Sequence, residues 1–379
     1  MILRGLVGIL RYLASWHLPR KLRRSEVRSI LVVELTRLGD VVVILPLLKA
    51  LKSHFANAEV YLLIDERYVT LVRALELDVV PLGIRSPISA GGMLSACLAA
   101  RKCRPDLACS MSPPKRNAAV ALASGARFKV GYLTHVDSLA PYLLTTPVEA
   151  FGFRESAHLS YGMENIGERG RRVIEAMGIN PVEYSNEVVF REGIEERTKE
   201  MLQAHGVLPE RKYVVMHPFS GWRYRNWDLE RFNTLAGRIV ATLPFDVVFV
   251  CDPREVKDLE PSLRQFEGEG AVHFYSSNDL LHTAVILKNA TLFVGNDSGP
   301  LHLATALGTS VVGLFGPASP LLTAPHAEHG TFLYRKVDCS PCDQRKCIRP
   351  NDHCMSLITV EDVFTEIVAH VMPARMANA

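Results

Sequence analysis

Residues 297–302, Asp-Ser-Gly-Pro-Leu-His, combine side-chain types and a spacing that suit the binding of an anion. An apolar run before them, Thr291–Val294, predicts a buried strand that ends in a tight turn. Pro300 suits the first position of a helix, whose free N–H groups would face an anion. Asp297 follows the carboxyl end of the strand, where open α/β sheets bind ligands, and His302 falls in the first helical turn. Without these two polar residues, the same unit would be an ordinary capped α/β crossover.

Three segments of the chain resemble, in order, the motifs of one enzyme family. They are ELTRLGDVVVILPLLKAL at 34–51, HPFSGWRYRNWDLERF at 217–232 and DSGPLHLATALGTSVVGLFGP at 297–317, with CSPC following at 339–342. The chain thus resembles glycosyltransferase family 9, the heptosyltransferases. The resemblance implies an α/β fold of the GT-B architecture, with two Rossmann-like domains facing a cleft. It also implies inverting transfer of a heptose from ADP-heptose to a lipopolysaccharide core-type acceptor.

Asp40 is the candidate catalytic base. It lies after a predicted strand at the start of a predicted helix, where an acid could also serve only as a helix cap. Glycosyl transfer requires an acceptor hydroxyl to lose its proton as it attacks the anomeric carbon, and a carboxylate can accept that proton. The aspartate of the family's GD motif has this role and falls on Asp40. Gly39 beside it would let the backbone approach the donor sugar.

Arg225 is the candidate contact for the phosphates of the donor. The family pattern has a basic residue two positions before a tryptophan, and here Arg225 precedes Trp227 by two. Lysine is the commoner residue there, although the guanidinium fork of arginine suits phosphate well. Arg223 is a second candidate, and a solvated loop arginine is the alternative.

The other donor-binding residues follow from the same resemblance. Ser298, Gly299 and the helix start after them would bind the pyrophosphate, where negative charge develops as the leaving group departs. Asp297 and His302 match the family's D[ST]GxxH positions, and we expect Asp297 to orient the sugar or the turn. Glu255 follows a predicted strand and could bind the ribose, by analogy with acids at the ends of other sheets.

Four of the eight cysteines are clustered near the end of the chain, at Cys339, Cys342, Cys347 and Cys354. Four thiols are the ligand number of a tetrahedral Zn²⁺ or iron site, and related family members carry similar cysteines. The alternative is a set of buried or free thiols. We expect a structural role in either case and no cofactor for catalysis, because arginine and a helix dipole can stabilise the phosphates.

The elements that position these residues alternate between strands and helices, which predicts parallel sheets. In the first half we expect strands at 29–34, 59–64, 78–82, 106–110 and 128–130, a turn at 35–40 that leads into a helix ending near 54, and a loop at 84–90. In the second half we expect strands at 213–217 and 245–250 and helices at 229–242, 254–266 and 278–288. Residues 134–168 could form a substrate-facing arm, and 180–209 form the interdomain passage.

Four regions are predicted from this pattern: a basic amphipathic segment at 1–28, an acceptor-side domain at 29–180, a nucleotide-sugar-binding domain with the cysteine cluster at 181–358, and a terminal helix and tail at 359–379. A chain of 379 residues is long enough for two domains of ordinary size. The tail helix, 359–371, could pack back on the first domain.

Composition describes a soluble globular protein, with 48% hydrophobic and 22% charged residues. The formal charge of +3 is too small to indicate a nucleic-acid partner. The cysteines are not spaced as a disulfide framework, and no apolar run reaches the roughly 18–20 residues of a membrane span. We therefore expect a reduced, cytoplasmic protein.

Met1–Arg28 is basic and amphipathic, with Leu and Trp side chains between its arginines. This pattern resembles a helix lying on an anionic membrane, here the inner face of the cytoplasmic membrane, where a lipid-linked saccharide acceptor would be. Packing on the protein's own surface is the main alternative. A signal peptide is disfavoured by Arg11 within the apolar region.

Other functions remain open at this stage. The same fold could use another nucleotide sugar or a protein acceptor, or could bind a sugar nucleotide without catalysis. The joint presence of Asp40, Arg225 and the residues from Asp297 to His302 disfavours a non-catalytic protein. A Rossmann dehydrogenase is disfavoured because no GxGxxG turn follows the first strand.

Overall fold

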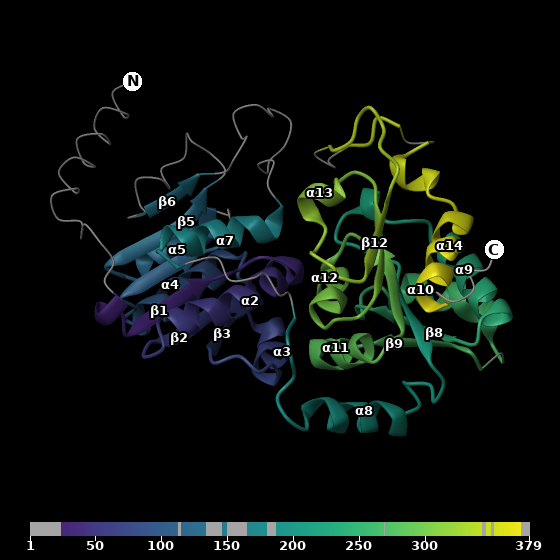
Figure 1. Cartoon of the computed structure of the whole chain (residues 1–379), viewed down its shortest axis with the longest axis horizontal. Coiled ribbons are helices and arrows are strands. Elements are labelled where there is room, and N and C mark those ends of the chain that lie inside the picture. The colour runs from purple at the N-terminus through teal and green to yellow at the C-terminus, as the bar shows by residue number, and fades with distance from the viewer. Residues whose placement is uncertain are drawn as a thin grey trace. The chain divides into compact units, whose positions relative to one another are not determined.

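The computed structural model describes residues 24–112, 115–133, 146–149, 165–179, 187–268, 270–342, 346–349 and 352–372. The chain divides into two compact units (Figure 1). The first comprises Met1–Arg73, Leu77–Ala157 and Tyr161–Tyr184, and the second comprises Ala74–Glu76, His158–Ser160 and Ser185–Ala379. Each unit is built on its own parallel sheet.

The sheet of the first unit has the strand order β3-β2-β1-β4-β5-β6, and every neighbouring pair is parallel. Its strands are β1 (Ser29–Val33), β2 (Glu59–Asp65), β3 (Val80–Ile84), β4 (Leu107–Ser110), β5 (Phe128–Leu133) and β6 (Thr146–Glu149). The strands β2 and β3, which follow β1 in sequence, lie on one side of it, and β4, β5 and β6 lie on the other side. The switch point of this sheet therefore lies between β1 and β4, where open α/β sheets bind ligands.

Helices cover both faces of this sheet, as the right-handed crossovers of parallel strands require. They are α2 (Leu38–His54), α3 (Val69–Ala74), α4 (Ala90–Lys102), α5 (Lys115–Ala123) and α7 (Ile166–Ala176). On one face, small residues of α4 and α5 pack on buried side chains of β1, β2 and β4; this cluster includes Leu31, Val33, Leu63, Ala96, Ala100, Ala108, Val120 and Ala121. Helices α2 and α7 pack on each other.

The sheet of the second unit has the order β12-β11-β10-β7-β8-β9, again all parallel. Its strands are β7 (Tyr213–His217), β8 (Asp246–Cys251), β9 (Val272–Ser276), β10 (Leu292–Asn296), β11 (Val311–Phe315) and β12 (Gly330–Tyr334). Its helices are α8 (Ile194–Ala204), α9 (Leu229–Thr242), α10 (Val256–Leu263), α11 (Leu280–Lys288), α12 (Gly299–Ala306), α13 (Pro320–Thr323) and α14 (Val360–Val371). The switch point lies between β7 and β10, so this unit repeats the topology of the first.

The tail helix α14 belongs to the second unit, where it packs on α9 (Figure 1). Val363 and Ile367 are fully buried in the same core as Phe232 and Ile239 of α9. The Arg238 guanidinium lies 3.8 Å from the centre of the Phe364 ring and pairs with Glu361. The prediction that this helix could pack on the first domain is therefore wrong.

The elements predicted by range are present, with ends shifted by up to three residues. The strand expected at 78–82 is β3, which begins at Val80, and the helix expected at 254–266 is α10 followed by a 3-10 turn, Arg264–Phe266. Several elements were not predicted individually: β6 within 134–168, α8 within the interdomain passage, the strands β9 and β12, and the helices α3, α4, α5, α7 and α13. The rest of the proposed arm, 134–145 and 150–164, and the basic segment at 1–23 lie outside the described residues.

Among the helices that the structure describes, none combines the length and the apolar composition needed to span a bilayer.

Candidate functional site

Asp40 lies in the first turn of α2, which begins at Leu38. The backbone N–H of Arg37 and the hydroxyl of Thr36 both bond to the Asp40 carboxylate, so the acid does cap the helix. Part of its surface stays accessible, yet burial raises the pKa of Asp40, while the charges of Arg169 and Arg37 oppose that rise. An accessible carboxylate with raised proton affinity suits a general base. Gly39, one residue earlier, is buried.

A second acid, Glu34, lies beside Asp40 and was not predicted as a site residue. Glu34 directly follows β1 and is fully buried. Ser112, which follows β4, donates to Glu34 Oε2 at 2.5 Å across the switch point of the sheet. Burial raises the pKa of Glu34 to about 7, the charge of Asp40 adds to the rise, and hydrogen bonds from Ser112 and Thr36 oppose it. The first unit therefore holds two neighbouring carboxyl groups with raised proton affinity.

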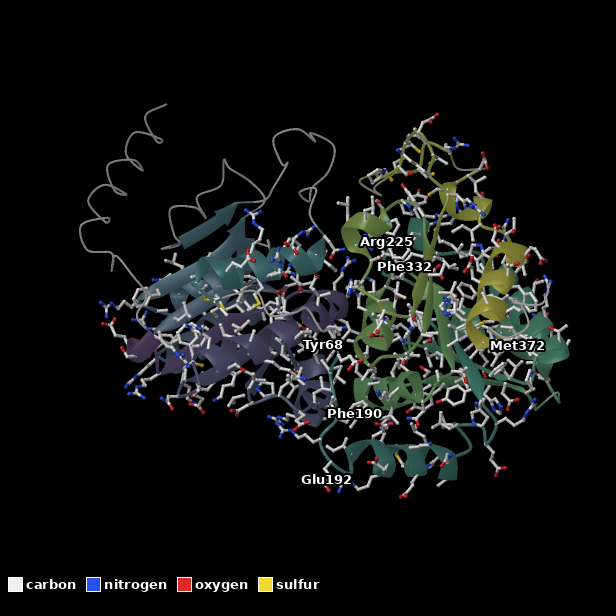
Figure 2. All side chains as sticks on the ribbon, in the orientation of Figure 1. Tyr68, Phe190, Glu192, Arg225, Phe332 and Met372 are labelled. Atoms are coloured by element: carbon white, nitrogen blue, oxygen red, sulfur yellow. The ribbon has the colours of Figure 1, made fainter. Side chains whose placement is uncertain are left out.

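Two further residues complete this cluster. Tyr68, labelled in Figure 2, is 6% exposed, and the backbone N–H of Leu38 at the start of α2 bonds to its hydroxyl. Burial raises the pKa of Tyr68, which stays a neutral phenol at pH 7. Arg169 of α7 is 4% exposed and acts on Asp40 through its charge. We refer to Glu34, Thr36, Asp40, Tyr68 and Arg169 as the first-unit acid cluster.

In the second unit, Arg225 and Asp297 form a largely buried ion pair. Arg225 Nη1 lies 2.8 Å from Asp297 Oδ2, with the two side chains 16% and 3% exposed. Thr323 of α13 donates to the same carboxylate oxygen at 3.2 Å. Figure 2 marks Arg225. Arg223 is exposed, so the structure brings Arg225 rather than Arg223 to Asp297.

The loop that carries Arg225 is fixed by the residues around it. Trp227 is 1% exposed; its backbone N–H donates to Asn296 Oδ1 at 3.0 Å and its indole N–H to the Ile358 carbonyl at 2.8 Å. Asn296 in turn donates to the Pro218 carbonyl at 2.7 Å, which ties the ends of β7 and β10 together. Tryptophan two residues after Arg225 therefore acts as the anchor that sets the position of the guanidinium.

The start of α12 lies directly after Asp297. Gly299 is the first residue of the helix, with Pro300 second, one residue earlier than predicted. Ser298 is the N-cap residue, makes no side-chain capping bond, and has its hydroxyl 3.4 Å from His217 Nδ1. The first N–H groups of α12 thus stand beside a buried guanidinium, which is the combination that binds phosphate groups.

His302 lies on α12, one turn from the start, and is 5% exposed. Within the described part of the chain its Nδ1 atom has no hydrogen-bond partner. Burial and the charge of Arg225 lower the pKa of His302 to about 4, and burial lowers that of His217 to about 4. Both rings are therefore neutral at pH 7, and each can donate one hydrogen bond and accept one. The structure thus brings Arg225, Asp297, Ser298, Gly299 and His302 together.

Glu255 lies after β8, at the carboxyl end of the same sheet, in the residue before α10. Its carboxylate accepts a hydrogen bond from the Asp252 backbone N–H at 2.9 Å. Burial raises the pKa of Glu255. The position suits the predicted contact with a ribose, and the local hydrogen bond shows that Glu255 also stabilises its own turn.

The four clustered cysteines lie between β12 and α14. Cys354 is buried and the other three are partly buried. A Cβ atom added to Gly316 would lie 2.9 Å from Cys354 Sγ, so this thiol packs directly on the backbone that follows β11. Among the described residues, no group of three or more histidine, cysteine or acidic side chains is arranged to hold a metal ion. Asp343, between these cysteines, lies outside the described residues.

Comparison with known proteins identifies the family. The sequence model described as glycosyltransferase family 9 (heptosyltransferase) matches residues 101–353 of this chain. The chain belongs to this family. A curated relative, lipopolysaccharide heptosyltransferase 3 of Escherichia coli K12, is 24% identical over 201 residues, which are 52% of this chain and 57% of the relative. The chain thus matches little more than half the length of that family member.

Solved structures share the fold of this family 9 chain. The family 9 glycosyltransferase of Veillonella parvula has a TM-score of 0.73 at 19% identity, covering 92% of this chain and 98% of its own. The Escherichia coli heptosyltransferase WaaC with ADP-2-deoxy-2-fluoro heptose has a TM-score of 0.64 at 16% identity, covering 89% and 98%. The predicted family and the predicted GT-B fold class, with two Rossmann-like units, are therefore confirmed.

Sequence reasoning missed most of the first-unit acid cluster. Glu34 had one visible signal, because a carboxylate at the end of an otherwise apolar strand must find hydrogen-bond donors. Its donors Ser112 and Asn117 lie about 80 residues away, however, and no local pattern links them. Arg169 directly follows the stretch 134–168, for which the sequence indicated only a possible substrate-facing arm, so no motif marked it.

Proposed function

We propose that this chain transfers a heptose from ADP-heptose to a lipopolysaccharide core-type acceptor. The observation that carries the proposal is the largely buried Arg225–Asp297 pair at the start of α12, at the switch point of a family 9 unit. A fixed cation next to a helix start is suited to a nucleoside diphosphate. The related WaaC structure holds an ADP-heptose analogue, which supports the choice of donor.

The proposed chemistry is a single displacement that inverts the anomeric carbon. Asp40 accepts the proton of the acceptor hydroxyl as that oxygen bonds to the anomeric carbon. The bond from this carbon to the phosphate oxygen breaks, and its electron pair leaves with the nucleoside diphosphate. Arg225 and the α12 N–H groups stabilise the charge that develops there, so no metal ion is needed for this step. Asp297 holds Arg225 in place, and Glu255 is proposed to bind the ribose.

A panel of nucleotide sugars tests this proposal. The purified chain is incubated with each donor and with a lipopolysaccharide core fragment, and release of free nucleotide is followed. We expect release that depends on both ADP-heptose and the acceptor. Release with another nucleotide sugar would identify a different donor, and release only with a protein acceptor would identify a different acceptor. Binding without any release would identify a non-catalytic protein.

We also propose that Cys339, Cys342, Cys347 and Cys354 hold one structural Zn²⁺ or iron ion. The support for this proposal is the number and type of the ligands, four thiols. The described side chains do not form a group of three ligands, so these cysteines would have to rearrange to bind the ion. Metal analysis of protein purified without chelator should find about one ion per chain, lost in Cys339→Ser/Cys342→Ser. The matched control is Cys97→Ser/Cys103→Ser, which removes two thiols outside the cluster. Absence of stoichiometric metal would leave four thiols without a metal role.

We further propose that residues 1–28 attach the enzyme peripherally to the inner face of the cytoplasmic membrane, where its lipid-linked acceptor lies. Apolar side chains would enter the interface, and each arginine or lysine near anionic lipid adds on the order of 1 kcal/mol. The full chain should float with anionic liposomes at low salt, while a chain beginning near Ser25 should not. The attraction should fade at 1 M salt, where the Debye length is about 3 Å. Equal flotation of both chains would place membrane binding elsewhere.

A further inference from the structure

Three residues of the first-unit acid cluster form a continuous hydrogen-bonded row. The Thr36 hydroxyl bonds to Glu34 Oε1 on one side and to the Asp40 carboxylate on the other. Glu34 is fully buried, with Ser112 at 2.5 Å from Oε2 and Asn117 Nδ2 at 3.3 Å from Oε1. Asn117 is itself fully buried and accepts the Leu35 backbone N–H, so the row is held by β1, β4 and α5.

This row contains one hydroxyl proton too few for two ionised acids. A threonine hydroxyl has a single hydrogen and can donate to only one carboxylate at a time. If Glu34 and Asp40 were both ionised, one of the two contacts would bring the Thr36 oxygen against a carboxylate oxygen with no hydrogen between them. A second proton removes this conflict. Two carboxyl groups that interact so closely keep a proton between them over a range of pH.

The surroundings decide which acid keeps that proton. Asp40 receives the Arg37 backbone N–H and the charges of Arg37 and Arg169, and all of these favour its ionised form. Glu34 is held by neutral donors, and the charge that acts on it is that of Asp40, which favours its protonated form. A protonated Glu34 can donate to the Thr36 oxygen while Thr36 donates to Asp40. Every hydrogen bond in the row is then satisfied.

We propose that Glu34 is the positioning residue of the catalytic base: it holds one proton, shared through Thr36, that keeps the Asp40 carboxylate ionised and fixed in orientation. The inference rests on the proposed function, in which Asp40 accepts the proton of the acceptor hydroxyl. Glu34 itself touches no substrate in this scheme. Ionisation of Glu34 removes this proton, so the Thr36 hydroxyl can no longer satisfy both carboxylates and the Asp40 carboxylate loses its fixed orientation. Among the described residues, Tyr68, a neutral phenol at pH 7, and Arg116, whose Nε donates to the Leu35 carbonyl at 3.0 Å, also lie near the row.

Thr36→Val and Thr36→Ser test the shared hydroxyl as a matched pair. Valine has nearly the shape of threonine but cannot donate, so kcat should fall about tenfold with the KM for the donor unchanged. Serine keeps the hydroxyl and should restore kcat to within about threefold of the wild type. Equal activity of the valine and serine variants would overturn the proposal.

Glu34→Gln tests the role of the proton that Glu34 holds. Glutamine keeps a neutral donor toward Thr36, so the variant should fold and retain kcat below pH 6, yet it cannot ionise. The wild type should show a fall in kcat/KM as the pH rises through about 7, where Glu34 loses its proton, and the variant should lack this fall. A variant with an unchanged profile would show that Glu34 has only a structural role.

Carbon-13 carboxyl NMR provides a readout that does not depend on activity. In the wild type, one glutamate should titrate near pH 7; it should be absent in Glu34→Gln and should titrate at lower pH in Asp40→Asn, where the neighbouring charge is gone. Titration of Glu34 unaffected by Asp40→Asn would refute the coupling. If no donor is turned over but the coupled titration is present, the proposed function fails and the proton-sharing pair stands. If transfer requires Asp40 while Thr36→Val is fully active, only the inference fails.

Discussion

Asp40→Asn should lower kcat by a factor on the order of 10²–10⁴, the range for loss of a general base. Asparagine has the size of aspartate and can still accept the Arg37 N–H, so the helix start should remain intact. The amide cannot take up the proton of the acceptor hydroxyl. Affinity for the nucleotide donor should change little, because the donor contacts are assigned to the second unit. Steady-state kinetics with ADP-heptose and a core acceptor give kcat, and calorimetry with ADP gives the affinity.

A surface acid provides the control for this substitution. Asp78 is 78% exposed and pairs with Lys52, and Asp78→Asn should leave kcat unchanged. A loss of kcat in Asp40→Asn accompanied by a similar loss of ADP affinity would indicate a disturbed fold. Near-normal turnover in Asp40→Asn would refute the assignment of Asp40 as the base.

The sequence predicted the parallel sheets well because their strands are short apolar runs separated by clear helix signals. Helix α9 has the predicted bounds, since Asp228 caps its start and Leu229–Thr242 carries a regular apolar face. The strand β6 was missed because it has only four residues, one of them a proline. Helix α8 was missed because its residues are mostly charged and polar, so the segment resembled a linker.

Site residues that belong to a local sequence motif could be predicted, whereas contacts between residues far apart in the sequence could not. Asp297 directly follows β10, while Asp40 and Arg225 lie in the segments that lead from β1 to α2 and from β7 to α9, and local motifs can show all three positions. The ion pair between Arg225 and Asp297 joins two residues 72 positions apart, one following β7 and one following β10, and only the sheet order brings them together. The same holds for Glu34, whose donors come from β4 and α5. Pairing of side chains across a sheet follows from topology, which residue types alone do not specify.

Arg225→Ala should weaken ADP binding by roughly 1.5–3 kcal/mol, the value of a charge-assisted hydrogen bond to phosphate. The structure adds a second cause for the loss. Asp297 is 3% exposed and loses the guanidinium 2.8 Å away, which leaves a buried carboxylate beside the place proposed for the phosphates. That charge would repel the ligand and would also lower the free energy of unfolding, since breaking a buried pair from one side is costly. Arg225→Lys keeps the charge but not the two-pronged geometry, so it should bind ADP with intermediate affinity.

The double variant Arg225→Ala/Asp297→Asn separates these two causes. Asparagine can still accept the Thr323 hydroxyl but carries no charge, so the repulsion is removed while the phosphate contact stays lost. Calorimetry with ADP should therefore show the double variant binding more tightly than Arg225→Ala and more weakly than the wild type, with stability partly restored. If the single and double variants bind ADP equally, Asp297 does not act on the ligand through its charge. If Arg225→Ala binds ADP as the wild type does, the phosphates are held by other residues, with Arg223 the next candidate.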